Sequence, residues 1–137
     1  MKSQLKDLPD NVIQEEYQRR FQRKKGEKLQ SSKASADHMR AFLSKLPGDV
    51  EYFGIIYLDT QLNIISTELV SSGSLSTASV FPREIIKRVL ALESGSILCF
   101  HNHPSLETQP SNSDRALTKK LQQALTSIDV SLLDHII

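Results

Sequence analysis

The stretch ILCFHNHPSLETQPSNSD, residues 97–114, joins a short apolar run to a cluster of polar side chains. The unbroken apolar run Ile97–Phe100 predicts a short buried strand. His101 and His103 follow it two residues apart, and the two-residue period of a strand places both imidazoles on the same side of the sheet. Because neutral imidazoles are good zinc ligands, this spacing indicates a metal site at the end of the strand.

Asp114 stands where a third ligand is expected, in the first turn of a helix that Ser111 begins. Pro104 and Pro110 stiffen the loop that leads to this helix. Two histidines and one aspartate leave a fourth position for water, which is typical of a catalytic zinc site. Two plainer interpretations stay open: the histidine pair as ordinary loop polarity, and Ser111-x-x-Asp114 as a capping box that needs no metal.

The rest of the chain alternates between helical and strand patterns. We expect helices within the first 30 residues and beginning at Ser35, Pro82 and Ser111, and strands at Glu51–Asp59, Ile64–Val70, Ile97–Phe100 and Val130–Ile137. This alternation predicts an α/β fold, a three-layer-like sandwich with a central mixed β-sheet flanked by helices. We expect Leu90 on a buried helix face, His38 on the surface, and Cys99 as a small buried thiol, with a weak metal or redox role for Cys99 left open.

Two regions are expected along the chain. Residues 1–30 form a polar, basic helical appendage, and residues 33–137 form the main domain. The basic residues at 19–28 are interpreted as a solvated helix face, with contact to DNA phosphates as the alternative. The chain stops inside the apolar pattern Asp134–Ile137, so we expect the closing C-terminal strands to be missing, and an exposed sheet edge there would favour a homodimer.

Length and composition exclude several classes of protein. The chain has 137 residues, 39% hydrophobic and 24% charged, which suits one globular domain. No apolar run approaches the ~20 residues that span a bilayer, and the N-terminus lacks the apolar segment of a secretory signal. A single cysteine excludes an internal disulfide framework and a Cys₄ or Cys₂His₂ zinc site within the chain. We therefore expect a cytoplasmic protein without a membrane partner.

Taken together, several motifs resemble one known family. They are His101-Asn102-His103-Pro104-Ser105, Pro110-Ser111-x-x-Asp114, Leu133-Asp134-His135-Ile136-Ile137 and, upstream, Phe53–Asp59, Gly73-Ser74-Leu75 and Pro82-Arg83-Glu84. The set resembles the JAMM (MPN⁺) metalloprotease signature, and more closely its RadC branch, over roughly residues 33–137. One departure is Leu106, where that branch usually has glycine. The resemblance implies a cytidine-deaminase-like, JAMM-type fold.

The resemblance also implies a set of site residues. His101, His103 and Asp114 match the zinc ligands, and Ser111 matches the serine that helps to hold the tetrahedral oxyanion. Glu51 matches the glutamate that binds the metal water and shuttles protons. The implied reaction is hydrolysis of a peptide or isopeptide amide in a protein or peptide substrate.

Some roles stay open at this point. Glu68 and Glu84 compete with Glu51 as the general base. His135 is an outer-shell partner of the metal, an alternative ligand, or a satisfied sheet histidine, and we favour the last. Because the RadC name is traditionally tied to DNA repair, a non-catalytic interaction or nucleic-acid-associated module on the same fold is the alternative function.

Overall fold

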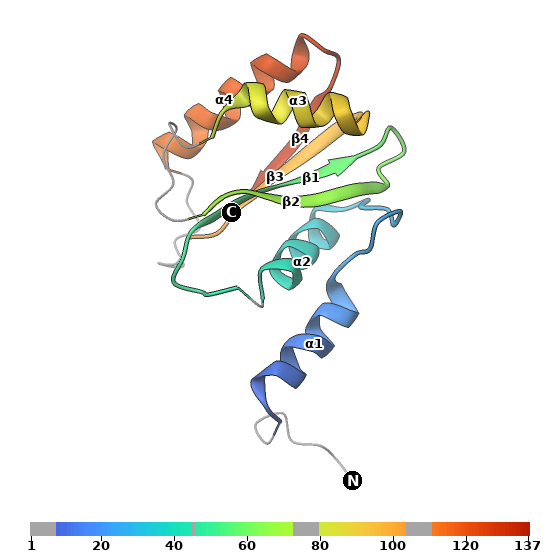
Figure 1. The fold of residues 1–137 in the computed structure, drawn as a ribbon, viewed down its shortest axis with the longest axis vertical. Helices are drawn as coiled ribbons and strands as arrows, with labels where there is room; N and C mark the ends of the chain where they lie inside the picture. The colour runs from blue at the N-terminus through green and yellow to red at the C-terminus, as the bar shows by residue number, and fades with distance from the viewer. Residues whose placement is uncertain (1–7, 45, 73–79, 104–110) are drawn as a thin grey trace.

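The computed structural model describes residues 8–44, 46–72, 80–103 and 111–137. Within these ranges a four-stranded sheet has the strand order β2-β1-β3-β4 (Figure 1). The strands are β1 (Tyr52–Leu58), β2 (Ile64–Ser72), β3 (Ser96–His101) and β4 (Ser131–Ile136), and the helices are α1 (Asp10–Phe21), α2 (Ser32–Leu43), α3 (Pro82–Leu92) and α4 (Asn112–Thr126). The central strand β1 is antiparallel to β2 and β3, whereas β3 and β4 are parallel and joined through α4. The predicted mixed sheet is confirmed.

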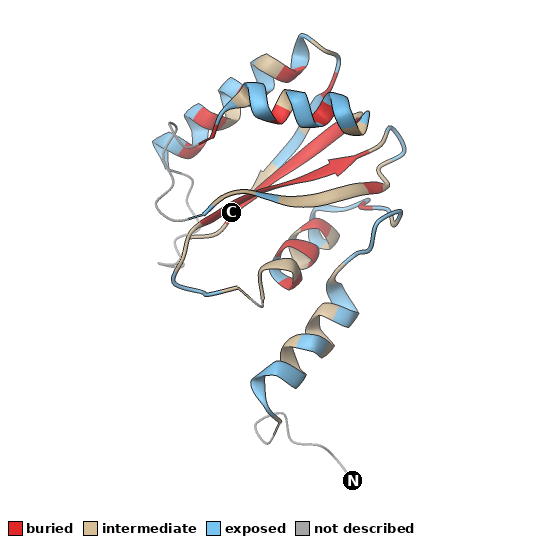
Figure 2. Ribbon diagram, in the orientation of Figure 1, coloured by how far each residue is buried: buried red, intermediate tan, exposed pale blue. Residues whose placement is uncertain are grey.

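The helices cover both faces of this sheet. Figure 1 shows α3 and α4 over one face and α2 over the other, with α1 beyond α2. No residue of α1 is buried, whereas β1 and β3 are buried along their whole length (Figure 2). The three-layer α/β arrangement expected from the sequence is therefore present.

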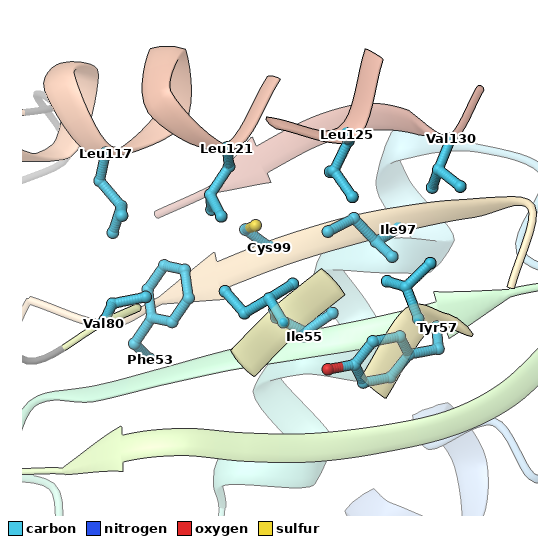
Figure 3. Packing of buried hydrophobic residues seen from close by; sticks show 12 residues of the cluster. Phe53, Ile55, Tyr57, Val80, Ile97, Cys99, Leu117, Leu121, Leu125 and Val130 are labelled. Carbon is cyan, nitrogen blue, oxygen red and sulfur yellow. The ribbon is translucent and has the colours of Figure 1, made fainter. Parts of the chain in front are cut away.

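Side-chain alternation along the central strands divides the core in two. Odd-numbered positions of β1 and β3 face α3 and α4, where Phe53, Ile55, Tyr57, Ile97 and Cys99 pack against Leu117, Leu121 and Leu125 (Figure 3). Even-numbered positions face α2, where Ile56, Leu58, Leu98 and Phe100 pack with Met39 and Leu29. Because His101 is two residues beyond Cys99, its side chain lies on the α4 side of the sheet.

Some local expectations from the sequence are wrong. The second helix is capped by Ser31, whose Oγ accepts a hydrogen bond from the Ala34 amide at 3.0 Å, so this helix begins before Ser35. The sequence also favours Gly95 as the residue that closes the third helix, but this helix ends at Leu92 and its C-cap is Glu93, which takes a left-handed conformation with φ 54°. Leu90 is 59% exposed, because the buried stripe of this helix follows Ile85 and Val89.

The expectation that His38 lies on the surface is also wrong, since only 1% of this residue is exposed. The backbone amide of Arg23 donates to its Nδ1 at 2.8 Å, and its Nε2 lies 2.9 Å from Thr67 Oγ1 on β2. The segment after α1 covers it, held by backbone bonds from Gly26 to the Ile64 carbonyl and by others nearby. His38 thus joins the N-terminal segment to the sheet.

The same docking brings residues before 33 into the packed unit. Leu29 is 3% exposed and belongs to the core on the α2 side. Several residues of the motifs quoted from the sequence lie outside the described residues: Gly73-Ser74-Leu75, Pro104, Ser105, Leu106 and Pro110. Among the helices that the structure does describe, none combines the length and the apolar character needed to cross a bilayer.

Candidate metal centre

The end of β3 is clamped to the segment that leads into β1. Asn102 Oδ1 accepts a hydrogen bond from the Tyr52 amide at 2.6 Å, and Asn102 Nδ2 donates to the Val50 carbonyl at 2.8 Å. Phe53 pairs with His101 across the antiparallel ladder. Sequence reasoning missed Asn102 as a clamp, although its place between two histidines is the signal: its side chain holds the backbone from which both imidazoles project.

His101, His103 and Asp114 come together at this edge of the sheet. One ligand atom from each lies within 4.8 Å of the other two. His101 Nδ1 is 3.1 Å from Asp114 Oδ1, and His103 Nε2 is 3.2 Å from Asp114 Oδ2. These separations are close to the ~3.3 Å between ligand atoms around a tetrahedral ion with bonds of ~2.0 Å. The structure therefore brings together the three residues that the sequence singled out.

Burial and hydrogen bonding favour the protonation states of His101 and Asp114 that bind a cation. The side chains of His101 and Asp114 are each 3% exposed, and that of His103 is 12% exposed. Burial lowers the pKa of His101, which favours the neutral imidazole that binds metals. Burial acts to raise the pKa of Asp114, but hydrogen bonds from Ser111 and the nearby imidazoles outweigh it, so this pKa is lowered and the carboxylate stays ionised.

A buried ring nitrogen without a partner further supports a metal ion at this site. Nε2 of His101 is buried and has no hydrogen-bond partner among the described residues. A buried polar atom left without a partner costs about 1–3 kcal/mol. Two imidazoles and one carboxylate are a common ligand set for a borderline ion such as Zn²⁺.

Ser111 forms the capping box that the sequence also allowed. Its Oγ accepts from the Asp114 amide at 3.0 Å, and its own amide donates to Asp114 Oδ2 at 2.8 Å. The cap and the metal site are compatible, because the same contacts turn the Asp114 carboxylate toward the two imidazoles. The local fold of the helix end thus orients the candidate third ligand.

The three candidate glutamates have different surroundings. Glu51 comes two residues before Phe53, so period two places it on the same side of the sheet as His101, and its charge acts to raise the pKa of His101. Glu68 instead binds Arg88, with Oε2 2.7 Å from Nη2, and accepts from Ser66. Glu84 is exposed at the start of α3. Of the three glutamates, Glu51 is the one whose charge affects the pKa of His101.

Two further residues border the cluster on the α4 side. Cys99 is buried in the core, and burial raises the pKa of its thiol, which matches the expectation of an inert core thiol. His135 on β4 pairs in register with Cys99. Burial lowers the pKa of His135 to about 4. Its Nδ1 lies 2.6 Å from Thr118 Oγ1, but its buried Nε2 has no hydrogen-bond partner in the described part of the chain, so the interpretation as a satisfied histidine holds for one nitrogen only.

This fold and this cluster are those of a JAB-type domain, and comparisons with known proteins agree. Residues 29–137 match the family model described as the RadC-like JAB domain. The chain therefore belongs to the RadC-like JAB domain family.

Curated relatives carry a family name without a function. A UPF0758 protein of Pseudomonas fluorescens (strain SBW25) is 42% identical over 109 residues, which cover 80% of this chain and 48% of that protein. A UPF0758 protein of Leptothrix cholodnii is 42% identical over 107 residues, which cover 78% of this chain and 47% of that protein. A UPF0758 protein of Azotobacter vinelandii is 38% identical over 109 residues, which cover 80% of this chain and 48% of that protein. The chain spans about half the length of the curated relatives it matches.

Proposed function

We propose that this chain is a zinc-dependent hydrolase of the JAMM type that cleaves a peptide or isopeptide amide in a protein or peptide substrate. The observation that carries the proposal is the buried group of His101, His103 and Asp114, whose ligand atoms lie within 4.8 Å of one another. These three residues would hold the ion. A bound zinc ion would supply a Lewis acid and would lower the pKa of water toward ~7.

Glu51 is proposed as the general base. Its charge acts on His101, which suits a carboxylate oxygen that takes a proton from the attacking water and returns it to the leaving amide nitrogen. Glu68 is less suited, because the guanidinium of Arg88 and the hydroxyl of Ser66 occupy its carboxylate and lower its pKa.

Ser111 is proposed to stabilise the charge that develops on the substrate carbonyl oxygen. Its Oγ already accepts a hydrogen bond from the Asp114 amide, so the hydroxyl hydrogen is left to donate. A donor aimed at the developing oxyanion typically contributes about 10²–10³ in rate. The capping role fixes the position of this hydroxyl before substrate arrives.

The test separates metal binding from hydrolysis. We expect purified protein to bind close to one equivalent of zinc, His103→Ala to lose it, and Glu51→Gln to keep the zinc but lose hydrolysis of a peptide library. Glu84→Gln is the matched control, because this exposed glutamate lies on α3, and it should leave both readouts unchanged. Wild-type protein that binds less than a tenth of an equivalent of zinc after reloading would refute the proposal.

A second candidate function, binding of nucleic acid, is favoured by one observation. A cleft of ≈ 680 Å³ between the α1 region and β2 is lined by Arg19, Arg23, Lys24 and Lys25, together with Thr67. We expect any DNA affinity carried by this cleft to fall steeply with salt. Lys24→Glu with Lys25→Glu should abolish it, and affinity that ignores both salt and these changes would exclude this cleft as the DNA site.

A homodimer through an exposed sheet edge also stays a prediction. Strand β4 is at the edge of the described sheet, and its Leu133 is 47% exposed. Sedimentation of the wild type beside Leu133→Lys decides between a monomer and an edge-to-edge dimer.

A further inference from the structure

His135 occupies a fixed position between α4 and the candidate metal centre. Its ring meets Phe53 edge-on, with centroids 5.7 Å apart, and lies 6.1 Å from the ring of His101 at a tilt of 34°. Strand β4 runs parallel to β3, and His135 pairs with Cys99, so it shares the face of the sheet on which His101 lies.

The hydrogen bonds of Thr118 determine which nitrogen of His135 carries the proton. The Thr118 hydroxyl donates to the Asp114 carbonyl oxygen at 2.8 Å, and a carbonyl can only accept. A hydroxyl has a single hydrogen, so in its 2.6 Å contact with His135 Nδ1 the imidazole must be the donor. Neutral His135 is therefore protonated on Nδ1 and carries a lone pair on Nε2.

The acceptor at His135 Nε2 and the ring nitrogen of His101 that faces away from Asp114 both need a hydrogen-bond partner. His135 Nε2 and His101 Nε2 are both buried without a hydrogen-bond partner among the residues described. His101 turns its Nδ1 toward Asp114 Oδ1, which leaves Nε2 for a second contact. Histidines that bind a metal through one nitrogen almost always donate the other N–H to an acceptor.

We propose that His135 is a positioning residue of the metal centre: its Nε2 accepts a hydrogen bond from a water molecule, and that water accepts the Nε2–H of His101. This contact fixes the tautomer of His101 that presents the Nδ1 lone pair beside Asp114. It also links two ligands through one chain of contacts, because Thr118 joins His135 to the backbone of Asp114. The inference rests on the metal centre proposed above.

The experiment compares zinc dissociation constants of the whole chain, measured by competition with a chelating dye. His135→Phe keeps a ring of similar size but cannot accept a hydrogen bond, and we expect its zinc affinity to fall about 10–100-fold. His135→Gln, which restores an acceptor oxygen, should recover most of the affinity.

His38→Phe is the matched control. His38 is also a buried histidine with a ring nitrogen bonded to a threonine hydroxyl, but its partners are Thr67 and Arg23 rather than the ligand cluster. We expect His38→Phe to lower stability and to leave zinc affinity within twofold of the wild type. The control therefore separates loss of a buried polar ring from loss of the contact with His101.

Nitrogen-15 NMR of the wild type supplies a readout that does not depend on activity. We expect His135 to be the Nδ1–H tautomer in both metal-free and zinc-loaded protein. A His135→Phe variant with normal zinc affinity, or a His135 protonated on Nε2, would overturn this inference and leave the proposed hydrolase standing. Wild-type protein that binds no zinc would overturn both.

Discussion

Protonation of His38 should destabilise the fold in a defined pH range. Burial, together with the charge of Arg23, lowers the pKa of His38 from 6.5 to about 4. In the unfolded chain the pKa returns to about 6.5, so between these two values the unfolded state binds more protons than the folded state. Stability is therefore greatest above pH ~6.5, falls as the pH drops toward 4, and levels off below that value.

The size of the effect follows from the shift in pKa. One pKa unit corresponds to ~1.4 kcal/mol, so the change from 6.5 to about 4 gives about 3 kcal/mol for His38 alone. The contacts explain why the folded state resists the proton: Nδ1 accepts from the Arg23 amide, and a proton there would put two donors face to face.

Urea unfolding between pH 4 and pH 7.5 measures this contribution. The pKa of His135 is also lowered to about 4, so the wild type alone shows both effects, and His38→Gln isolates one of them. We expect the wild type to lose about 3 kcal/mol more than His38→Gln across this range. Parallel stability curves for the two proteins would refute the reasoning, because His38 would then titrate equally in both states.

Three further predictions concern packing, the helix cap and the metal. Gly54→Ala should destabilise the fold by about 1–3 kcal/mol in urea unfolding, because a Cβ there would lie 2.1 Å from Cζ of the fully buried Phe100 ring, too close for either group to stay in place. Ser111→Ala should cost ~1 kcal/mol through the lost cap, whereas a loss of more than tenfold in kcat for any hydrolysis found would show its second role at the reaction centre. Zinc at 100 times its dissociation constant should stabilise the wild type by ~2.7 kcal/mol in thermal unfolding, an effect that EDTA reverses and His103→Ala lacks.

The strands and the grouping of His101, His103 and Asp114 were predictable because they depend on local pattern. The apolar run at Ile97–Phe100 and the spacing of His101 and His103 fix a strand and a shared face without knowledge of the rest of the chain. Asp114 was predictable for a similar reason, since a first-turn residue of a capped helix lies near the strand that feeds it.

The missed features depend on contacts between distant segments. His38 is polar and lies on an amphipathic helix, so the sequence favours exposure, but the segment after α1 folds over it and supplies the Arg23 amide. Asn102 reads as loop polarity until β1 and β3 are paired, when its amide meets Tyr52 and Val50. Local patterns carry no information on which segment covers which face, so tertiary contacts overrode the expectation for His38 and gave Asn102 a role that the sequence did not predict.

The way each ligand is held bears on how metal binding relates to folding. His101 is positioned by its pairing with Phe53, and Asp114 by the capping box with Ser111. The Asn102 clamp holds the backbone between the histidines. All these contacts are made by the protein itself, so the site should be formed before metal arrives.

Metal-free protein should thus keep its far-UV and near-UV circular dichroism, unlike small zinc domains that unfold without their ion. A chain that loses its near-UV signal on chelation would instead show that the ion, rather than the strand register and the helix cap, holds the three ligands together.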